Sequence, residues 1–234
     1  MVELKYKRVL LKISGEAFGD DENKLFDFVK IKNIAELVSE IQKTGAEVAI
    51  VNGAGNIFRG AVADQIDRTD ADFIGMTATM VNSLALQAVL RKLKVPESIY
   101  SVLPIGNLIP ELDISSAKAD LESGKAVILT GGDGKPYFTN DTAGVKRAVE
   151  LECELIIKAS TVDGVYSDDP KLNPDALKFD QISYEDVLNK GLKVMDQAAI
   201  EIARDNNLKI IVTKFEKESV LKILQGENIG TLIG

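Results

Sequence analysis

The sequence contains no histidine among its 234 residues and only one cysteine, Cys153. Without histidine the chain cannot build Ser-His-Asp or Cys-His catalysis, and a zinc enzyme is disfavoured. A single cysteine excludes an internal disulfide. We expect Cys153 to be partly packed rather than nucleophilic, because no histidine is present to activate it.

Positive charge is also in short supply. The chain has 28 lysines and arginines against 36 aspartates and glutamates, which gives a net charge of −8. Nucleic acids bind to basic surfaces, so we expect no nucleic-acid partner. Lys12 interrupts the N-terminal apolar run of residues 9–11, which is too short for a signal peptide or a membrane helix. We therefore expect a cytoplasmic protein without a membrane partner.

The chain alternates short apolar runs with segments of helical period. The predicted strands cover residues 9–13, 47–51, 99–103, 126–129, 155–158 and 209–212. The predicted helices cover residues 31–41, 141–151, 197–204 and 219–224, together with a long helix that begins near 70–72. Gly45 is the stop signal of the first helix, and Asn140 or Asp141 is the expected cap of the helix at 141–151. In the long helix, Met76, Met80, Leu84 and Ala88 are expected on one buried face. This alternation predicts an α/β fold with a mainly parallel sheet, helices on both faces, and ligands beyond the carboxyl ends of the strands. No repeat or linker divides the chain, so we expect one domain over residues 1–234.

Two turns that follow strands carry cationic side chains. Lys12 stands beside Ser14 and Gly15, where an ammonium can neutralise phosphate oxygens, although a solvated lysine is an alternative. Residues 53–60 combine close-approach glycines with Arg59, whose planar fork matches phosphate. Their spacing fits neither the dinucleotide pattern nor a P-loop, and a tight turn with a surface arginine is the alternative.

Two further turns follow the strands at 126–129 and 155–158. Residues 130–142 supply glycines, a rigid Pro136, two aromatic rings and a final carboxylate, Asp141; we reject a P-loop here because Pro136 follows Lys135. Residues 158–170 contain Tyr166, which could stack on a base, and carboxylates that could hold a ribose, a metal or a lysine. An Asx-rich turn is the alternative there. The polar stretch 165–180 is interpreted as a functional loop.

This inventory contains lysines, an arginine, glycine turns and carboxylates, but no pair of nucleophile and base. Phosphoryl transfer depends mainly on positioning and charge neutralisation, so it fits a histidine-free site better than acyl transfer does.

Six ordered motifs make the chain resemble the bacterial uridylate kinases of the amino acid kinase superfamily over nearly its whole length. They lie at residues 10–17, 55–60, 75–79, 136–141, 162–170 and 192–196. The resemblance implies a three-layer αβα sandwich, a homohexamer under allosteric control, and transfer of the γ-phosphoryl group of ATP to UMP with Mg²⁺. It also implies a UMP-binding part at about 1–140 and an ATP-binding part at about 141–234.

The resemblance further implies roles for individual residues. The catalytic residues would be Lys12, Arg59, Asp141 and Asp163. ATP would be bound by Lys12, Ile13, Ser14, Gly15, Gly55, Arg59, Ser160, Tyr166 and Asp169. UMP would be bound by Ala54, Arg59, Asp72, Asp133, Gly134, Lys135, Pro136, Tyr137, Phe138, Thr139 and Asn140. No protein ligand of a metal is implied.

Three positions depart from the family pattern. Ala54 replaces a glycine, Asp133 stands where threonine is common and would put an acid near the nucleobase or phosphates, and Asn140 replaces a hydroxyl residue. A kinase of a carboxylate or carbamate substrate and a non-catalytic nucleotide sensor remain alternatives, whereas an NAD-dependent oxidoreductase fails on the glycine spacing.

Overall fold

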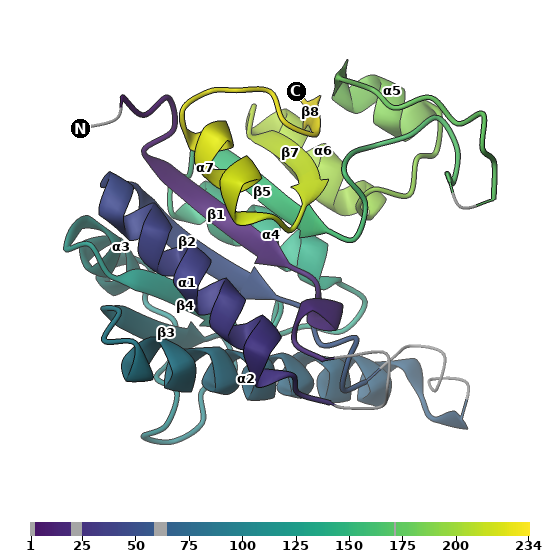
Figure 1. Ribbon diagram of the computed structural model, residues 1–234. Coiled ribbons are helices and arrows are strands. Elements are labelled where there is room, and N and C mark those ends of the chain that lie inside the picture. The colour runs from purple at the N-terminus through teal and green to yellow at the C-terminus, as the bar shows by residue number, and fades with distance from the viewer. Residues whose placement is uncertain (1–2, 20–24, 59–64, 171) are drawn as a thin grey trace.

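The computed structural model describes residues 3–19, 25–58, 65–170 and 172–234, and its centre is a twisted eight-stranded sheet (Figure 1). The strands are β1 (Arg8–Ile13), β2 (Glu47–Asn52), β3 (Glu97–Ser101), β4 (Ala126–Thr130), β5 (Leu155–Ser160), β6 (Gln181–Ile182), β7 (Lys209–Lys214) and β8 (Thr231–Ile233). Their order is β3-β4-β2-β1-β5-β7-β8-β6, and every pair is parallel except β7 with β8. The predicted mainly parallel sheet is therefore confirmed.

Helices cover both faces of this sheet. They are the short 3₁₀ turn η1 (Gly15–Ala17), α1 (Phe28–Thr44), α2 (Arg68–Lys92), α3 (Ile114–Glu122), α4 (Asn140–Glu150), α5 (Tyr184–Asn189), α6 (Gln197–Asp205) and α7 (Lys217–Leu224). Buried side chains of α1, α2 and α7 form one apolar cluster with the sheet, and those of α3, α4, α5 and α6 form a second cluster on the opposite face. The three-layer αβα sandwich expected from the sequence is confirmed.

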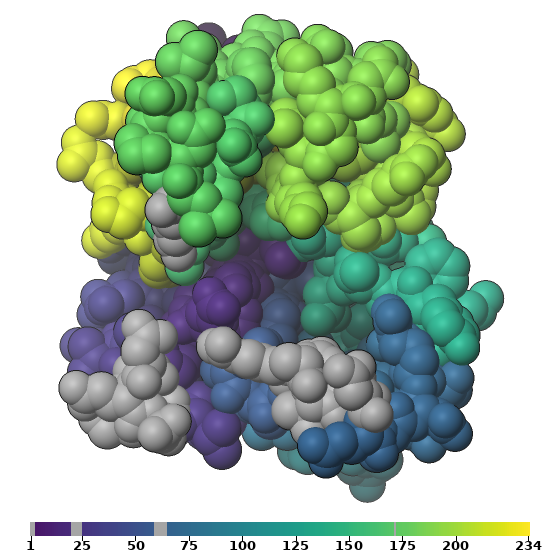
Figure 2. Space-filling model, turned by 90° about the vertical axis from the view of Figure 1, so that its right-hand side faces the viewer, coloured from purple at the N-terminus to yellow at the C-terminus, as the bar shows by residue number. Residues whose placement is uncertain are grey.

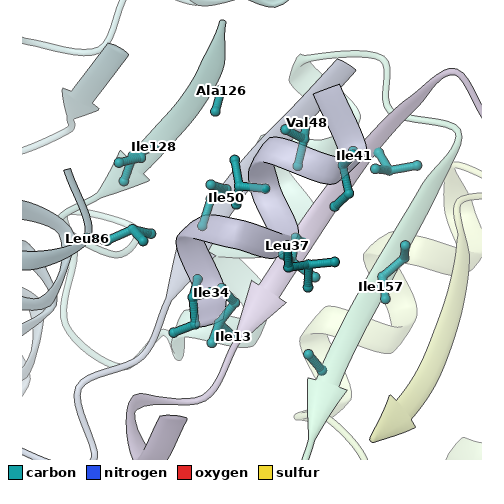
Figure 3. Close-up of a cluster of buried hydrophobic side chains, with 14 of the residues drawn as sticks. Ile13, Ile34, Leu37, Ile41, Val48, Ile50, Leu86, Ala126, Ile128 and Ile157 are labelled. Carbon is teal, nitrogen blue, oxygen red and sulfur yellow. The ribbon is translucent and has the colours of Figure 1, made fainter. Parts of the chain in front are cut away.

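The alternation of side chains along β1 separates the two cores. Leu11 and Ile13 belong to the cluster under α1, whereas Leu10 belongs to the cluster under α4. Figure 3 shows the first cluster, where Ile34, Leu37 and Ile41 of α1 point toward strand side chains. Because both faces of a parallel sheet are covered, its strands read as continuous apolar runs, which is why they were recognisable in the sequence.

The long helix α2 differs in one respect from the prediction. Met76 and Met80 are buried, but Ala88 is exposed, and Leu86 and Leu90 complete the buried face instead. A spacing of four residues rotates by about 40° at each step of a helix with 3.6 residues per turn, so Ala88 leaves the face that Met76 begins. By length and composition α2 could cross a membrane, but half of its most apolar stretch is buried inside the molecule, and a core helix of a soluble protein meets the same criterion.

Several element boundaries also differ, and some elements were not predicted. The N-cap of α4 is Thr139 rather than Asn140 or Asp141, because its hydroxyl accepts hydrogen bonds from the backbone N–H groups of Asp141 and Thr142. β3 begins at Glu97, two residues before the prediction, and α3, α5 and the short strands β6 and β8 were not predicted.

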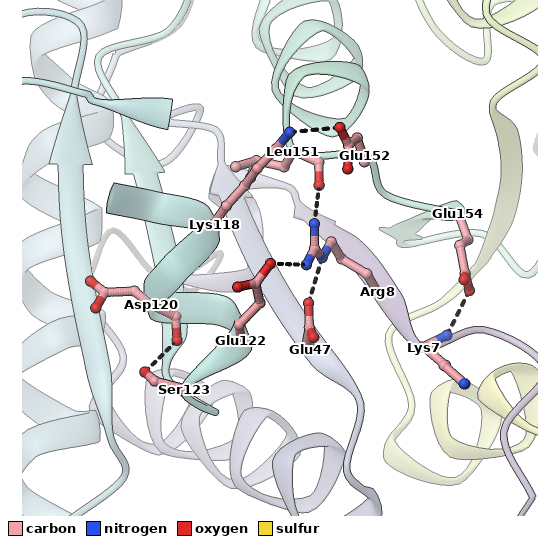
Figure 4. A network of polar contacts seen from close by, with 10 residues as sticks. All are labelled: Lys7, Arg8, Glu47, Lys118, Asp120, Glu122, Ser123, Leu151, Glu152 and Glu154. Carbon is pink, nitrogen blue, oxygen red and sulfur yellow. Dashed lines mark hydrogen bonds and ion pairs between the residues drawn. The ribbon is translucent and has the colours of Figure 1, made fainter. Parts of the chain in front are cut away.

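The amino ends of the strands carry a network of ion pairs (Figure 4). Arg8, the first residue of β1, donates to Glu47 of β2, to the carbonyl of Leu151 at 2.8 Å and to Glu122 at 3.3 Å. Nearby, burial raises the pKa of the Cys153 thiol to about 12, which agrees with a packed cysteine rather than a nucleophile. This end of the sheet is therefore built for structure, and the candidate site lies at the other end.

Candidate active site

Two lysines and one carboxylate meet at the carboxyl ends of the central strands. Lys12 of β1 and Lys158 of β5 are direct neighbours in the parallel register, and Asp141 lies in the first turn of α4. Lys12 Nζ lies 2.5 Å from Asp141 Oδ1, and Lys158 Nζ lies 2.9 Å from Asp141 Oδ2. All three side chains are largely buried, with exposed fractions of 11–16%.

The charges of this cluster do not cancel. Burial alone would raise the pKa of Asp141, but the ammonium groups of Lys12 and Lys158 outweigh it and hold that pKa below its usual value. Burial lowers the pKa of Lys158, and Asp141 opposes that effect. With both lysines protonated and Asp141 ionised, the cluster carries one net positive charge, which suits it to phosphate oxygens.

Lys158 is held in place from the loop before α6. Its ammonium donates to the carbonyl oxygen of Val194 as well as to Asp141. Lys158 begins the predicted turn at residues 158–170, but the sequence motifs assign it no role. Its position next to Lys12 in the sheet is the signal that could have identified it, since charged neighbours at one sheet edge face the same ligand space.

Asp196, the N-cap of α6, connects this loop with α4. Its carboxylate accepts from the hydroxyl of Thr142 at 2.7 Å, from the hydroxyl of Thr139 and from the backbone N–H of Ala199 at 3.1 Å. Thr139 in turn caps α4 next to Asp141. The motif at 192–196 thus fixes Lys158 through Val194 and the start of α4 through Asp196, a role that the sequence did not reveal.

The first two glycine turns pack directly against each other. The Gly53 N–H donates to the Ile13 carbonyl at 2.9 Å, and a Cβ atom on Gly15 would lie only 2.3 Å from the backbone nitrogen of Gly55. Ala54, which replaces a glycine of the family pattern, is buried in this contact. Ile13, Ser14, Gly15, Ala54 and Gly55 are therefore brought together beside Lys12, whereas Arg59 lies outside the described residues.

Polar side chains of α2 form hydrogen bonds with these turns and with the ends of β2 and β4. Asn82 donates to the Gly53 carbonyl at 2.8 Å, and Ser83 donates to Asn52 at 2.6 Å. Thr79 pairs with Thr130 and accepts from the Gly131 N–H, both at 3.1 Å. These contacts are buried, so α2 fixes the ends of β2 and β4 relative to each other.

The glycine-rich loop, residues 131–139, follows β4 and depends on left-handed backbone. Gly131 and Gly132 have φ values of +81° and +62°, and a Cβ atom at Gly131 would lie 2.5 Å from Ser101 Oγ. At Tyr137, where φ is +70°, the N–H donates to Asp72 Oδ2 at 2.7 Å. Asp72, which the resemblance assigns to UMP binding, also accepts from Arg68, and its bond with Tyr137 fastens α2 to this loop.

Asp133 does not face open solvent in this loop. Its side chain is 5% exposed and lies 2.9 Å from Lys146 Nζ of α4. The departure from the family pattern is thus matched by a cation inside the molecule. Lys135, Tyr137, Phe138 and Thr139 are exposed, while Gly134, Pro136 and Asn140 are half-buried.

A cavity of about 550 Å³ opens beside the lysine cluster. The residues that line it include Lys158, Val194, Ser160, Tyr166 and Asp169. Figure 2 faces the carboxyl ends of the strands and shows a hollow between the green C-terminal elements above and the purple and blue N-terminal elements below. Part of the polar stretch at 165–180 therefore forms a wall of this cavity.

Asp163 has partners of its own. It accepts from Lys178 at 2.9 Å and from the Tyr166 hydroxyl at 2.7 Å, and the hydrogen bond from Lys178 is the main cause of its lowered pKa. Lys178 and Asp163 line a second hollow of about 530 Å³, and Tyr166 lines both this hollow and the first cavity. Asp163 therefore pairs with Lys178, and not with a lysine of the cluster of Lys12, Asp141 and Lys158.

The family model described as "Amino acid kinase family" matches residues 7–214. The chain therefore belongs to the amino acid kinase family. Among curated proteins it is similar to a uridylate kinase of Rickettsia bellii, with 44% identity over 98% of both chains. It is also similar to a chloroplastic uridylate kinase of Arabidopsis thaliana, with 41% identity over 99% of this chain and 69% of the relative.

The chain is also similar to solved structures of UMP kinases. The UMP kinase of Bacillus anthracis superposes with a TM-score of 0.94 at 39% identity, covering 98% of this chain and 96% of that one. The UMP kinase of Ureaplasma parvum superposes with a TM-score of 0.92 at 34% identity, covering 99% of this chain and 100% of that one. The resemblance inferred from the six sequence motifs is confirmed.

Proposed function

We propose that this protein is a UMP kinase that transfers the γ-phosphoryl group of ATP to UMP and releases UDP and ADP. The observation that carries the proposal is the cluster of Lys12, Asp141 and Lys158. It holds one net positive charge where two glycine turns, a glycine-rich loop and a cavity converge. Fixed cations aimed at a transferring phosphoryl group supply the main catalytic effect in such reactions.

ATP is assigned to the C-terminal part, at about 141–234. Its nucleoside would occupy the 550 Å³ cavity beside Ser160, Tyr166 and Asp169. Its phosphates would then extend past Lys158 toward the backbone of residues 12–15 and Gly55, with Arg59 at the meeting point of the two phosphate chains. The connection from the cavity to the lysine cluster through Lys158 supports this direction.

UMP is assigned to the N-terminal part, at about 1–140. Asp72 would hold the ribose, while Ala54, Arg59 and the glycine-rich loop with Asn140 would surround the phosphate and base. Because the Asp133 carboxylate is paired with Lys146, we assign its contact with UMP to the backbone rather than to the side chain.

The chemistry then needs little from the protein beyond charge and position. Lys12 and Lys158 would neutralise charge that develops on the transferred group, and Asp141 would hold both ammonium groups in place. Asp163, with Lys178, would act at the outer edge of the ATP site.

Mg²⁺ is assigned to the ATP phosphates. Within the described residues there is no group of three or more cysteine or carboxylate side chains that could hold a metal ion. Magnesium usually keeps several waters and binds through substrate phosphates, so the assignment requires no protein cage.

The test is ADP release in the presence of ATP and Mg²⁺ with UMP, CMP, AMP, aspartate or carbamate as acceptor. We expect release with UMP well above the other four. Release with aspartate or carbamate instead would favour the amino acid kinases of this fold. Nucleotide binding without any release would favour a sensor.

We also propose a cytoplasmic homohexamer whose activity is under allosteric control. Support for assembly comes from apolar side chains on the outer face of α2, where Phe73, Ile74 and Val81 are 40–44% exposed. Light scattering should then give six times the chain mass of 25.4 kDa. A monomer at micromolar concentration would refute the hexamer.

A further inference from the structure

Lys146 contacts the glycine-rich loop at two places. Its ammonium lies 2.9 Å from both oxygens of Asp133, and it lies over the ring of Phe138 at 4.2 Å from the ring centre. A cation at this distance over an aromatic ring is attracted by its electron-rich face. One side chain of α4 therefore holds both flanks of the segment 134–137.

Two other tethers of the loop come from a different helix. Thr79 accepts from the Gly131 N–H at 3.1 Å, and Asp72 accepts from the Tyr137 N–H at 2.7 Å; both belong to α2. Lys146 supplies a tether from α4, the helix that also carries Asp141. The loop assigned to UMP is thus connected to the helix assigned to phosphoryl transfer.

We propose that Lys146 is a positioning residue for the acceptor nucleotide. Through Asp133 and Phe138 it holds the glycine-rich loop in its binding conformation before UMP arrives, and in a fixed place relative to Asp141. The proposal rests on the proposed function, since it deepens the same site. A loop that is ordered in advance does not need to be ordered by its ligand, so the pair should lower the KM for UMP.

The different burial of Lys146 and Asp133 predicts which of their variants should lose the most UMP affinity. Lys146→Met leaves a carboxylate that is 5% exposed, and the more distant Arg147, at 3.9 Å, is then its remaining cationic partner among the described residues. Asp133→Asn leaves an ammonium that is 30% exposed and can turn to water. Removing one member of a buried pair costs more than removing both, because the uncompensated charge stays behind. The double variant should therefore be milder than Lys146→Met.

Steady-state kinetics test this order. We expect Lys146→Met to raise the KM for UMP by about tenfold, equivalent to about 1.4 kcal/mol. Its kcat and its KM for ATP should stay within about twofold, since the ATP site does not contact the pair. The double variant should fall between wild type and Lys146→Met, and Lys146→Arg should restore most of the affinity. Lys118→Met, which breaks an ion pair with Glu152 in the network of Figure 4, is the matched control and should change neither KM.

A KM for UMP that stays near wild type in Lys146→Met would overturn the proposal. So would an equal loss of kcat and of both affinities in a folded variant, because that result means general damage rather than loop positioning. If Lys146→Met does not fold, Asp133→Asn and Lys146→Arg carry the comparison.

Hydrogen exchange without nucleotides separates this proposal from the function itself. Amides of residues 131–139 should exchange faster in Lys146→Met than in wild type, and unchanged exchange would refute the positioning role. If wild type releases no ADP with UMP, the proposed function fails, but the exchange measurement still decides whether Lys146 orders the loop.

Discussion

Replacing Lys158 by methionine should separate catalysis from folding. The ammonium of Lys158 lies 2.9 Å from Asp141, but Asp141 keeps Lys12 at 2.5 Å when Lys158 is removed. No buried charge is left alone, and methionine fills a similar volume without the cost of burying an ammonium. We therefore expect the free energy of unfolding to change by only about 1 kcal/mol.

The catalytic loss should be much larger. One of the two cations that we assign to the transferred phosphoryl group disappears, and removal of one such preorganised group typically costs about 10²–10³-fold in kcat, or about 3–4 kcal/mol. The assay is ADP release at saturating ATP and UMP, with thermal unfolding measured on the same samples. Lys158→Arg keeps the charge and should recover part of the rate.

Asp141→Asn is the contrasting variant. It leaves two largely buried ammonium groups without their shared carboxylate, so it should lower both kcat and stability. If Lys158→Met kept more than about a tenth of the wild-type kcat, the assignment of Lys158 to the phosphoryl group would be wrong.

Four further predictions address the same site. Lys12→Ala should lose most turnover while UMP still binds by calorimetry, and near-normal turnover would contradict its role. Arg59→Ala should raise the KM for UMP more than that for ATP, and an equal rise would count against its assignment mainly to UMP. Gly15→Ala places a Cβ atom 2.3 Å from the Gly55 nitrogen, so it should force the two turns apart and lower both activity and thermal stability. Because burial lowers the pKa of Lys158, kcat should fall as pH rises through a value below the ordinary lysine pKa of about 10.4, and Lys158→Arg, which does not titrate there, should shift this fall to higher pH.

Local signals in the sequence were enough for the order of the main strands and helices. The strands were visible because a sheet covered on both faces selects uninterrupted apolar residues, and α1 ended where Gly45 adopts φ +87°. The error at Ala88 came from applying a four-residue spacing over three turns, where the rotation accumulates. The N-cap of α4 is the residue whose side chain reaches the free N–H groups of the first turn. The backbone geometry before the helix gives that position to Thr139, and neighbouring Asn140 and Asp141 have equally suitable side chains in the sequence.

The residues missed at the site share a different cause. Lys158 becomes meaningful only once β5 is known to pair with β1, and Asp196 only once α6 lies against the start of α4. Both facts depend on contacts between distant parts of the chain. Asp133 stands out as a departure from the family pattern, but its partner Lys146 lies thirteen positions later on a helix, and no local pattern pairs the two residues.

The chemistry of the proposed acceptor, UMP, explains why the site can work without a histidine base. A hydroxyl nucleophile must lose a proton during attack, and a kinase of hydroxyl groups therefore positions a base beside it. The phosphate of UMP is largely ionised at neutral pH because its second pKa is near 6, so its attacking oxygen already lacks the proton. What such a reaction demands is compensation for the repulsion between two anionic phosphates. We assign that compensation to the described cluster of Lys12 and Lys158 around Asp141, which is largely buried, so that each charge would act more strongly than in water. A site without histidine is therefore chemically sufficient for the proposed acceptor.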